Sequence, residues 1–184
     1  MTDEAPSPWV VRFAPLIARG ARVLDLAAGH GRHTRFFAER QAQVVAADRD
    51  PAALAGLAAT PGIETHVVDL ESTDWPFAGE RFDAIVVVRY LHRALFPHLL
   101  AALADDGVVL YETFAAGNAR YGRPANPAFL LQPGELLEFA RDRLTVVAFE
   151  QGFVAQAQPA VQQRLAAVGR ARAWPPLLPE WAWG

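Results

Sequence analysis

The sequence predicts an α/β protein built on a doubly wound, mostly parallel sheet with helices on both faces. Short, nearly all-apolar segments alternate along the chain with segments of helical character. The first apolar segment, residues 22–26, has the composition of a strand buried on both faces of a parallel sheet. Later segments of this kind end at Asp48 and Asp69. In such sheets ligands bind beyond the carboxyl ends of the strands, where the strand order reverses, so we expect the site there.

The chain begins with an expected helix over residues 7–19. Ser7 is a suitable N-cap, and Pro8 fits the first helical position because an N–H would have no partner there. Pro15 predicts a kink or an early end, since proline removes a backbone hydrogen bond.

After this helix, strands and helices alternate. Strands are expected at residues 22–26, 43–47, 63–68, 82–88, 108–114 and 144–149. Helices are expected at 33–40, at 51–58 with Asp50 as N-cap, at 91–104 with Pro97 marking the true start, and at 133–139. Residues 161–168 favour a last strand, although VQQRLAAV is also compatible with a helix. Residues 115–129 form a loop that is too long for a simple connection.

Composition limits the classes of protein and of site. The 184 residues, 52% of them hydrophobic, suit a single domain over 1–184, with an N-terminal helical segment (1–20) and a Trp/Pro-rich tail (169–184). The net charge of −3 makes nucleic acid an unlikely partner. Cysteine and lysine are absent, which excludes disulfides, thiolate metal sites and lysine Schiff bases, and no metal is expected.

The start of the chain and the length of its apolar stretches indicate where in the cell to expect the protein. The start, MTDEAPSPW, lacks an apolar signal core, and no apolar stretch is long enough to span a bilayer. We therefore expect a cytoplasmic protein with no membrane partner. Trp174, Trp181 and Trp183 in the tail are expected to cover a surface groove or a dimer contact, and both a monomer and a homodimer remain open.

The stretch VLDLAAGHGRH, residues 23–33, points to a ligand. Gly29 and Gly31 allow the backbone to pass very close to a bound molecule. The helix that follows offers free N–H groups and a partial positive charge. Asp48 lies nineteen residues after Gly29, where a carboxylate can accept both hydroxyls of a ribose. These features fit NAD and S-adenosylmethionine (SAM) equally.

Three features favour SAM over NAD. The dinucleotide fingerprint has a third glycine where this chain has Thr34. Asp25 precedes the loop, and a carboxylate there suits the ammonium group of SAM but repels a pyrophosphate. Asp69 ends the third strand and is placed to receive an adenine amino group.

With these motifs in place, the chain resembles the class I SAM-dependent methyltransferases over about residues 20–115. VLDLAAGHG is similar to their first motif, AADRD (46–50) to the second, VVDLE (67–71) to the third, FDAIVVVRYLHR (82–93) to the fourth and DDGVVLYETF (105–114) to the fifth. The GRH after the glycine loop resembles the small tellurite-resistance-type branch. YETF, GN, RPANPAFLL and GELLEF resemble a mostly uncharacterised bacterial group of such enzymes.

The resemblance implies a Rossmann-like sheet with its last strand antiparallel, and SAM as the cofactor. Together with the arguments above, it implies these cofactor-binding residues: Asp25, Ala27, Ala28, Gly29, Gly31, Arg32, His33, Asp48, Arg49, Asp69, Leu70, Val88 and Arg89. Ala27 stands where the family often has glycine, and we expect its φ to stay below zero, because alanine is then tolerated.

The methyl acceptor is expected at the edge where the fourth and fifth strands end. His92 is the best candidate general base by residue type, followed by Tyr90 and Glu112. Tyr111 and Arg120 are candidate substrate contacts, and Tyr111 and Glu112 should point to opposite faces of the sheet. We expect in-line methyl transfer to an unidentified small molecule. The alternatives are a SAM-binding domain without transferase activity, acting through protein partners, and an NAD(P)-binding oxidoreductase.

Overall fold

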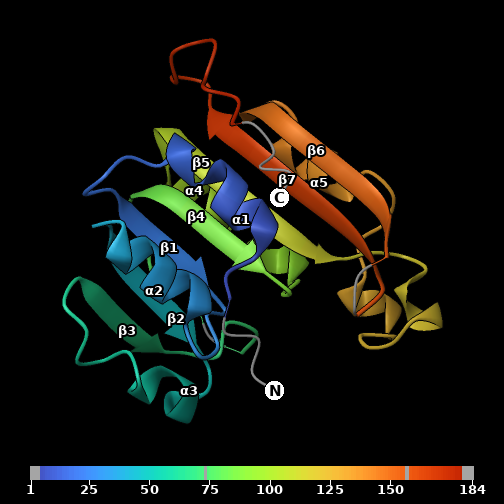
Figure 1. Ribbon diagram of the computed structural model, residues 1–184, viewed down its shortest axis with the longest axis horizontal. Helices are drawn as coiled ribbons and strands as arrows, with labels where there is room; N and C mark the ends of the chain where they lie inside the picture. The colour runs from blue at the N-terminus through green and yellow to red at the C-terminus, as the bar shows by residue number, and fades with distance from the viewer. Residues whose placement is uncertain (1–4, 73, 156–157, 180–184) are drawn as a thin grey trace.

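The computed structural model describes residues 5–72, 74–155 and 158–179. Strands within these ranges form one seven-stranded sheet in the order β3-β2-β1-β4-β5-β7-β6 (Figure 1). They are β1 (Arg22–Leu26), β2 (Gln43–Asp48), β3 (Ile63–Val67), β4 (Phe82–Val88), β5 (Leu103–Phe114), β6 (Leu144–Val154) and β7 (Ala160–Gly169). β1 to β5 run parallel, and β7 lies antiparallel between β5 and β6. The order reverses between β1 and β4, so ligands are expected at the carboxyl ends of these two strands.

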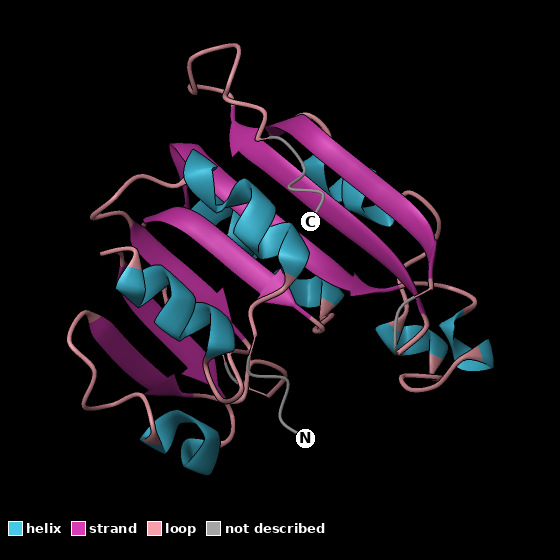
Figure 2. Ribbon diagram, viewed as in Figure 1, coloured by secondary structure: helices cyan, strands magenta, loops and turns pink. Residues whose placement is uncertain are grey.

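Helices cover both faces of this sheet (Figure 2). One face carries α1 (Pro8–Phe13) with the 3₁₀ turn Ala14–Leu16, and α2 (Arg32–Glu39). The other carries α4 (Phe96–Ala102), preceded by the 3₁₀ turn Arg93–Leu95, and α5 (Glu135–Ala140). The short α3 (Pro51–Ala55) packs against β2 and β3. The doubly wound arrangement is confirmed.

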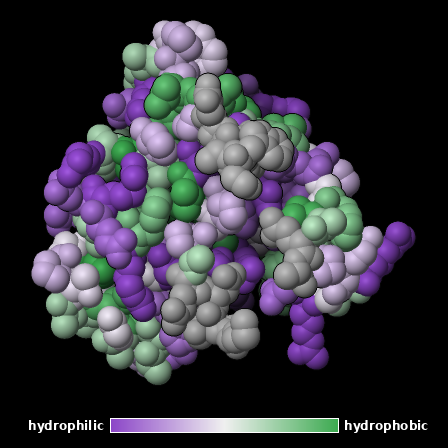
Figure 3. All heavy atoms as spheres, in the orientation of Figure 1, coloured by the Kyte–Doolittle hydropathy of each residue, from purple (hydrophilic) through white to green (hydrophobic). Residues whose placement is uncertain are grey.

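Two apolar layers fill the space between the sheet and its helices. Along β4, Ala84, Val86 and Val88 pack with α1 and α2, whereas Ile85 and Val87 pack with α4 and α5. Side chains of a strand alternate between faces, and both faces are covered, so β4 is apolar without a break from Ala84 to Val88. In the space-filling view of the α1 and α2 face, hydrophilic residues cover much of the surface and hydrophobic ones form smaller separate areas (Figure 3).

The N-cap and the early end expected for the N-terminal helix are confirmed, but the helical segment ends at Leu16 and not at residue 19. The Ser7 side chain accepts a hydrogen bond from Trp9 N and so caps α1, with Pro8 at its start. The α-helix ends at Phe13, and a 3₁₀ turn that contains Pro15 follows it. Asp50 likewise caps α3 by accepting from Ala52 N.

Several boundaries differ from the sequence expectation, and pairing explains most of them. β5 starts at Leu103, not near residue 108, because Leu103 is extended after α4 and pairs with Phe82. β6 continues to Val154 because its last residues pair with the start of β7. Residues 161–168 lie in a strand, since β5 and β6 pair with β7 on both sides and satisfy its backbone. α3 ends early, at Ala55, with Gly56 as its C-cap.

The described part of the tail is fastened to the body of the protein by Arg172. Its guanidinium donates to Leu16 O (2.6 Å) and Asp106 O (3.2 Å). Trp174 is exposed, and Trp181 and Trp183 lie outside the described residues. Among the described helices, none is both long and apolar enough to cross a bilayer.

Candidate functional site

The turn after β1 begins at Ala27, which adopts the left-handed conformation with φ 56°. The expectation of a negative φ was wrong. Ala28 N must reach across to Ala47 O, 3.0 Å away on β2, and the chain turns sharply to make this bond. Alanine therefore occupies a position that glycine would adopt without strain, at a cost of about 1–2 kcal/mol.

Gly29 and Gly31 both have positive φ, at 54° and 76°, but they serve different purposes. A Cβ on Gly29 would project into open space, and Gly29 N donates to Asp48 Oδ2 (2.8 Å), which ties the loop to the end of β2. A Cβ on Gly31 would lie only 2.4 Å from Leu57 Cδ1. Gly29 thus leaves room for a ligand, whereas Gly31 is required for close packing of the loop on Leu57.

Asp25 lies beneath this loop, with 1% of its surface exposed. Burial raises its pKa from 3.8 to about 6, although hydrogen bonds from Thr34 act in the opposite direction. The Thr34 hydroxyl donates to Asp25 Oδ2 at 2.5 Å. The residue that breaks the dinucleotide fingerprint is therefore the partner of this buried carboxyl group.

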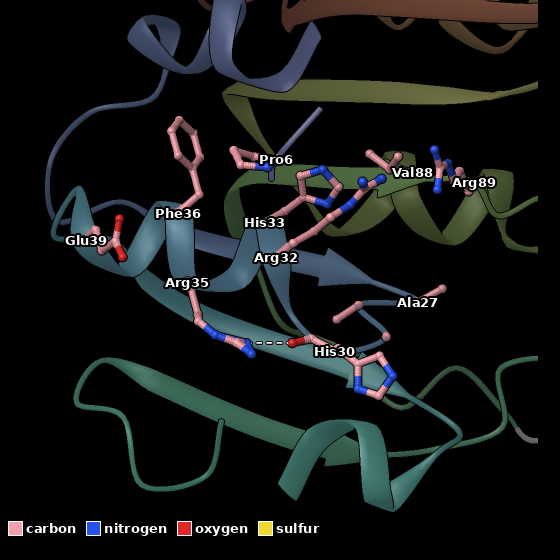
Figure 4. Close-up of a pocket in the computed structure, with 12 residues that line it drawn as sticks. Pro6, Ala27, His30, Arg32, His33, Arg35, Phe36, Glu39, Val88 and Arg89 are labelled. Carbon is pink, nitrogen blue, oxygen red and sulfur yellow. Dashed lines mark hydrogen bonds between the residues drawn. The ribbon is translucent and has the colours of Figure 1, made fainter. Parts of the chain in front are cut away.

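A larger cavity of about 780 Å³ opens above the loop and along α2 (Figure 4). Figure 4 shows Arg32 and His33 extending from the start of α2 towards Pro6 and Val88, while Arg35 reaches back to His30 O (2.6 Å). The lining residues are Pro6, Ala27, Ala28, Gly29, His30, Arg32, His33, Arg35, Phe36, Glu39, Val88 and Arg89. Basic groups outnumber acidic ones in this wall.

A second cavity of about 270 Å³ lies at the ends of β2 and β3. Its lining residues are Ala27, Asp48, Arg49, Val68, Asp69, Leu70, Glu71, Tyr90 and Phe129. Backbone N–H groups of Gly29 and Asp50 hold the Asp48 carboxylate, at 2.8 and 2.9 Å. Asp69 accepts from Glu71 N (3.0 Å), and this bond together with one from Ser72 lowers its pKa. Two carboxyl groups thus face one small cavity.

Ala27 lines both cavities, so they meet at the strained turn after β1. Among the predicted cofactor residues, Asp25 and Gly31 line neither cavity, and the others are divided between the two. A ligand with a ribose at one end and charged groups at the other could lie across the turn.

Of the candidate catalytic groups, Tyr90 lies in the wall of the smaller cavity. Its hydroxyl is buried and has no hydrogen-bond partner among the described residues. Burial and the nearby Glu71 and Asp69 raise its pKa to about 12. Tyr111 is buried on the opposite side of β5 from Glu112, donates to Tyr90 O (3.1 Å), and also has a raised pKa through burial. Both phenols remain protonated at neutral pH, which argues against either as a general base.

Glu112 is buried in the α1 layer and is already engaged. Its Oε2 accepts from the Ser7 hydroxyl (2.9 Å) and lies 3.1 Å from Arg164 Nε in an ion pair. Ser7 N in turn donates to His33 Nε2 (3.1 Å), so this nitrogen carries no proton. Ser7 therefore joins α1, α2 and β5, and holds Pro6 at the larger cavity.

The remaining candidates lie outside the two cavity walls. His92, at the turn after β4, lies close enough to Asp69 to lower its pKa further, although it lines neither cavity. Arg120 is exposed in the 3₁₀ turn Asn118–Arg120 of the long loop. No group of three or more His, Asp or Glu side chains in the described ranges is arranged to hold a metal.

Sequence reasoning missed several residues of the walls. A search for a common face of α2 would have found three of them, because Arg35, Phe36 and Glu39 follow the predicted Arg32 at helical spacing. Pro6 and Phe129 come from distant segments, and no local signal marks them.

Comparisons with known proteins identify the family and the fold of this chain. A family model described as a methyltransferase domain matches residues 2–156. Among solved structures, TehB from Haemophilus influenzae has a TM-score of 0.76 at 19% identity, covering 90% of this chain and 63% of that one. The chain thus spans less than two thirds of the length of TehB. A search of curated proteins found no significant match.

Two further structures match more of their own length. One is a TehB-like SAM-dependent methyltransferase from Corynebacterium glutamicum, with a TM-score of 0.64, 20% identity, and 89% and 88% of the two chains covered. The other is the 1,6-didemethyltoxoflavin-N1-methyltransferase of Burkholderia thailandensis, solved with 1,6-didemethyltoxoflavin and S-adenosylhomocysteine (SAH), with a TM-score of 0.66, 24% identity, and 91% and 80% covered. The family model covers most of the chain and the folds agree, so the chain belongs to the methyltransferase-domain family and has the class I SAM-dependent fold.

Proposed function

We propose that this protein transfers the methyl group of SAM to a small-molecule acceptor by direct in-line displacement. The junction of the two cavities at Ala27 carries the proposal. SAM has a nucleoside half and an amino-acid half joined at the sulfonium, and the two cavities offer one compartment for each.

The smaller cavity suits the nucleoside half. Asp48 is held by two backbone N–H groups and retains lone pairs for the ribose hydroxyls. Asp69 sits across the same cavity and would accept from the adenine amino group, with Leu70 as an apolar neighbour. A volume of about 270 Å³ is of the size an adenosine requires.

The larger cavity suits the amino-acid half and leaves room for an acceptor. Gly29 lets the backbone approach the ligand, and Arg32 and His33 extend from the start of α2 beside it. Asp25, below the loop, would contribute negative potential for the ammonium group. The cavity of about 780 Å³ exceeds what a methionine moiety fills, so the acceptor has space next to the junction.

SAM supplies an activated methyl group on a good leaving group, so the work of the chain is alignment and exclusion of water, which can contribute several kcal/mol. The raised pKa values of Tyr90 and Tyr111 argue against a phenolate base. His92 stays the candidate base for an acceptor that holds its proton. A small acceptor is in line with the Burkholderia structure, which contains 1,6-didemethyltoxoflavin.

Calorimetric titration with SAM and with NAD tests the proposal. Asp48→Ala should weaken SAM binding roughly ten- to a hundredfold, because charge-assisted hydrogen bonds to hydroxyls are worth about 1.5–3 kcal/mol. Asp50→Ala is the matched control, since Asp50 caps α3 and lines neither cavity. Unchanged SAM affinity in Asp48→Ala would remove Asp48 from the ribose site. Tight SAM binding without turnover across a broad panel of acceptors would favour a binding domain without transferase activity.

A further inference from the structure

The long loop between β5 and α5 is closed at its base. Ala116 N donates to Leu131 O (2.8 Å), and Leu131 N donates to Phe114 O (3.0 Å). The buried Asn118 fixes the first half of the loop, since its side chain donates to Pro124 O and accepts from Val161 N, both at 3.0 Å. The loop is thus anchored to β5 and β7.

Arg93 fixes the second half of this loop. Its guanidinium donates from Nη1 to Ala128 O (2.8 Å) and from Nη2 to Leu130 O (2.9 Å). Nε and Nη2 also bind the two carboxylate oxygens of Glu135, at 2.6 and 2.9 Å. Glu135 accepts from Gln132 N (2.7 Å) as well, so one ion pair holds the loop at both sides of residue 129.

Phe129 stands between the two carbonyl groups that Arg93 holds. Its ring forms part of the wall of the smaller cavity, together with Asp48, Asp69 and Tyr90, yet 45% of its surface is exposed. An aromatic ring at the mouth of a cavity gains apolar contact when a flat ligand enters. The Tyr90 hydroxyl in the same wall lacks a partner among the described residues, which is a second sign of a polar ligand.

We infer that Phe129 covers the nucleoside half of the cofactor, and that Arg93 is the positioning residue that holds Phe129 there. The inference rests on the proposed function, because it assigns the smaller cavity to adenosine. Arg93 lines neither cavity and acts through the loop backbone on either side of Phe129. The segment that follows β5 therefore takes part in cofactor binding, although the sequence suggested only acceptor contacts there.

Binding of SAH to purified variants tests this assignment without any acceptor. Phe129→Ala should weaken SAH binding roughly tenfold, mainly through faster dissociation, because a stacked ring and its buried area are lost. Phe129→Tyr, which keeps the ring, should bind as the wild type does. Phe153→Ala is the matched control: Phe153 is another exposed aromatic residue, packed on Tyr121, and lines neither cavity.

The nucleoside fragment 5′-methylthioadenosine shows which half of the ligand Phe129 meets. Its affinity should fall in Phe129→Ala by the same factor as that of SAH. A loss for SAH alone would place Phe129 against the amino-acid half and overturn the assignment.

A double-mutant cycle tests the part played by Arg93. Arg93→Ala should weaken SAH binding, and the Arg93→Ala/Phe129→Ala variant should bind no worse than Phe129→Ala, because Arg93 acts through the ring. Arg93→Lys, which keeps a charge for Glu135 but cannot span both carbonyls, should show the same pattern if Arg93→Ala does not fold. Additive losses would overturn the positioning role. Failure of the wild-type protein to bind SAH would overturn the proposed function as well, whereas unchanged binding in Phe129→Ala would overturn only this inference.

Discussion

Ala27 and Arg89 hold equivalent places at the ends of β1 and β4, and both are strained. Their φ angles are 56° and 59°, in a region that residues with a Cβ rarely adopt, and both line the larger cavity. Such strain persists where the surrounding structure enforces it, and it gathers at ligand sites. Each turn is fixed by a bond to a neighbouring strand, from Ala28 N to Ala47 O and from Arg89 N to Glu112 O.

Ala27→Gly should raise the free energy of unfolding by about 0.5–1 kcal/mol, because relief of left-handed strain exceeds the entropic cost of glycine. Ala101→Gly provides the control, since Ala101 is an exposed residue of α4 and glycine there should cost about 1 kcal/mol. Urea unfolding of both variants measures the difference. Equal destabilisation of the two would mean that the turn relaxes to a negative φ in solution.

Asp25 gives the stability a distinct pH dependence. Its pKa, about 6 in the folded protein, exceeds the ordinary aspartate value of 3.8, so the folded state binds this proton more tightly. The resulting stabilisation is present below about pH 4 and is lost as the pH rises through 6, by about 3 kcal/mol at about 1.4 kcal/mol per pKa unit.

Asp25→Asn removes this titration. The unfolding free energy of the variant minus that of the wild type should therefore increase by about 3 kcal/mol between pH 4 and pH 8, as followed by urea titration at each pH. Thr34→Val should raise the pH at which this stabilisation is lost, because it removes the hydrogen bond that stabilises the Asp25 carboxylate. A difference that stays constant with pH would show that Asp25 has an ordinary pKa.

At the scale of elements, α1 is joined to the sheet through a buried polar chain. Arg164 on β7 lies between Glu112 on β5 and Glu150 on β6, and Ser7 connects Glu112 to α1 and α2. Glu112 is buried, whereas 41% of the Glu150 side chain is exposed. Burial decides how much each glutamate contributes to the free energy of unfolding. Water screens the exposed pair of Arg164 with Glu150 but not the buried pair of Arg164 with Glu112.

Glu112→Ala should lower the free energy of unfolding by about 3 kcal/mol, because it leaves the Arg164 charge and the Ser7 hydroxyl without their buried partner. Glu150→Ala, which removes the exposed partner of the same arginine, should cost less than about 1 kcal/mol. Denaturant unfolding compares the two. If Glu112→Ala kept full stability but lost turnover, Glu112 would again be a candidate general base at the acceptor site.

At the scale of the whole molecule, the sequence predicted what depends on local pattern. Strands buried on both faces read as apolar runs, so β1 and β4 were predicted with their observed bounds. Residues next to strand ends, such as Gly29, Asp48 and Asp69, reached the expected edge because parallel strands all end there.

What escaped prediction depends on contacts between distant segments. Phe129 reaches the smaller cavity because Arg93, 35 and 37 residues away from its carbonyl partners, holds the loop. Glu112 is withdrawn from the acceptor side by Ser7, 105 residues away in the chain. The sign of φ at Ala27 likewise follows from a bond to β2. No local sequence pattern predicts these contacts, because each of them forms only between segments that the folded sheet brings together.

The first helix and the last strand meet in the core: Trp9 is buried, and its indole N–H donates to Leu165 O on β7 (3.2 Å), 156 residues further along the chain. A ribosome makes Leu165 156 residues after Trp9. Until β7 has been synthesised, the nascent α1 has no β7 to pack against, and its apolar side must stay in water or be shielded by a chaperone. The wall that Pro6 contributes is therefore completed only after β7 is made, so a nascent chain that has not reached β7 does not present the complete larger cavity.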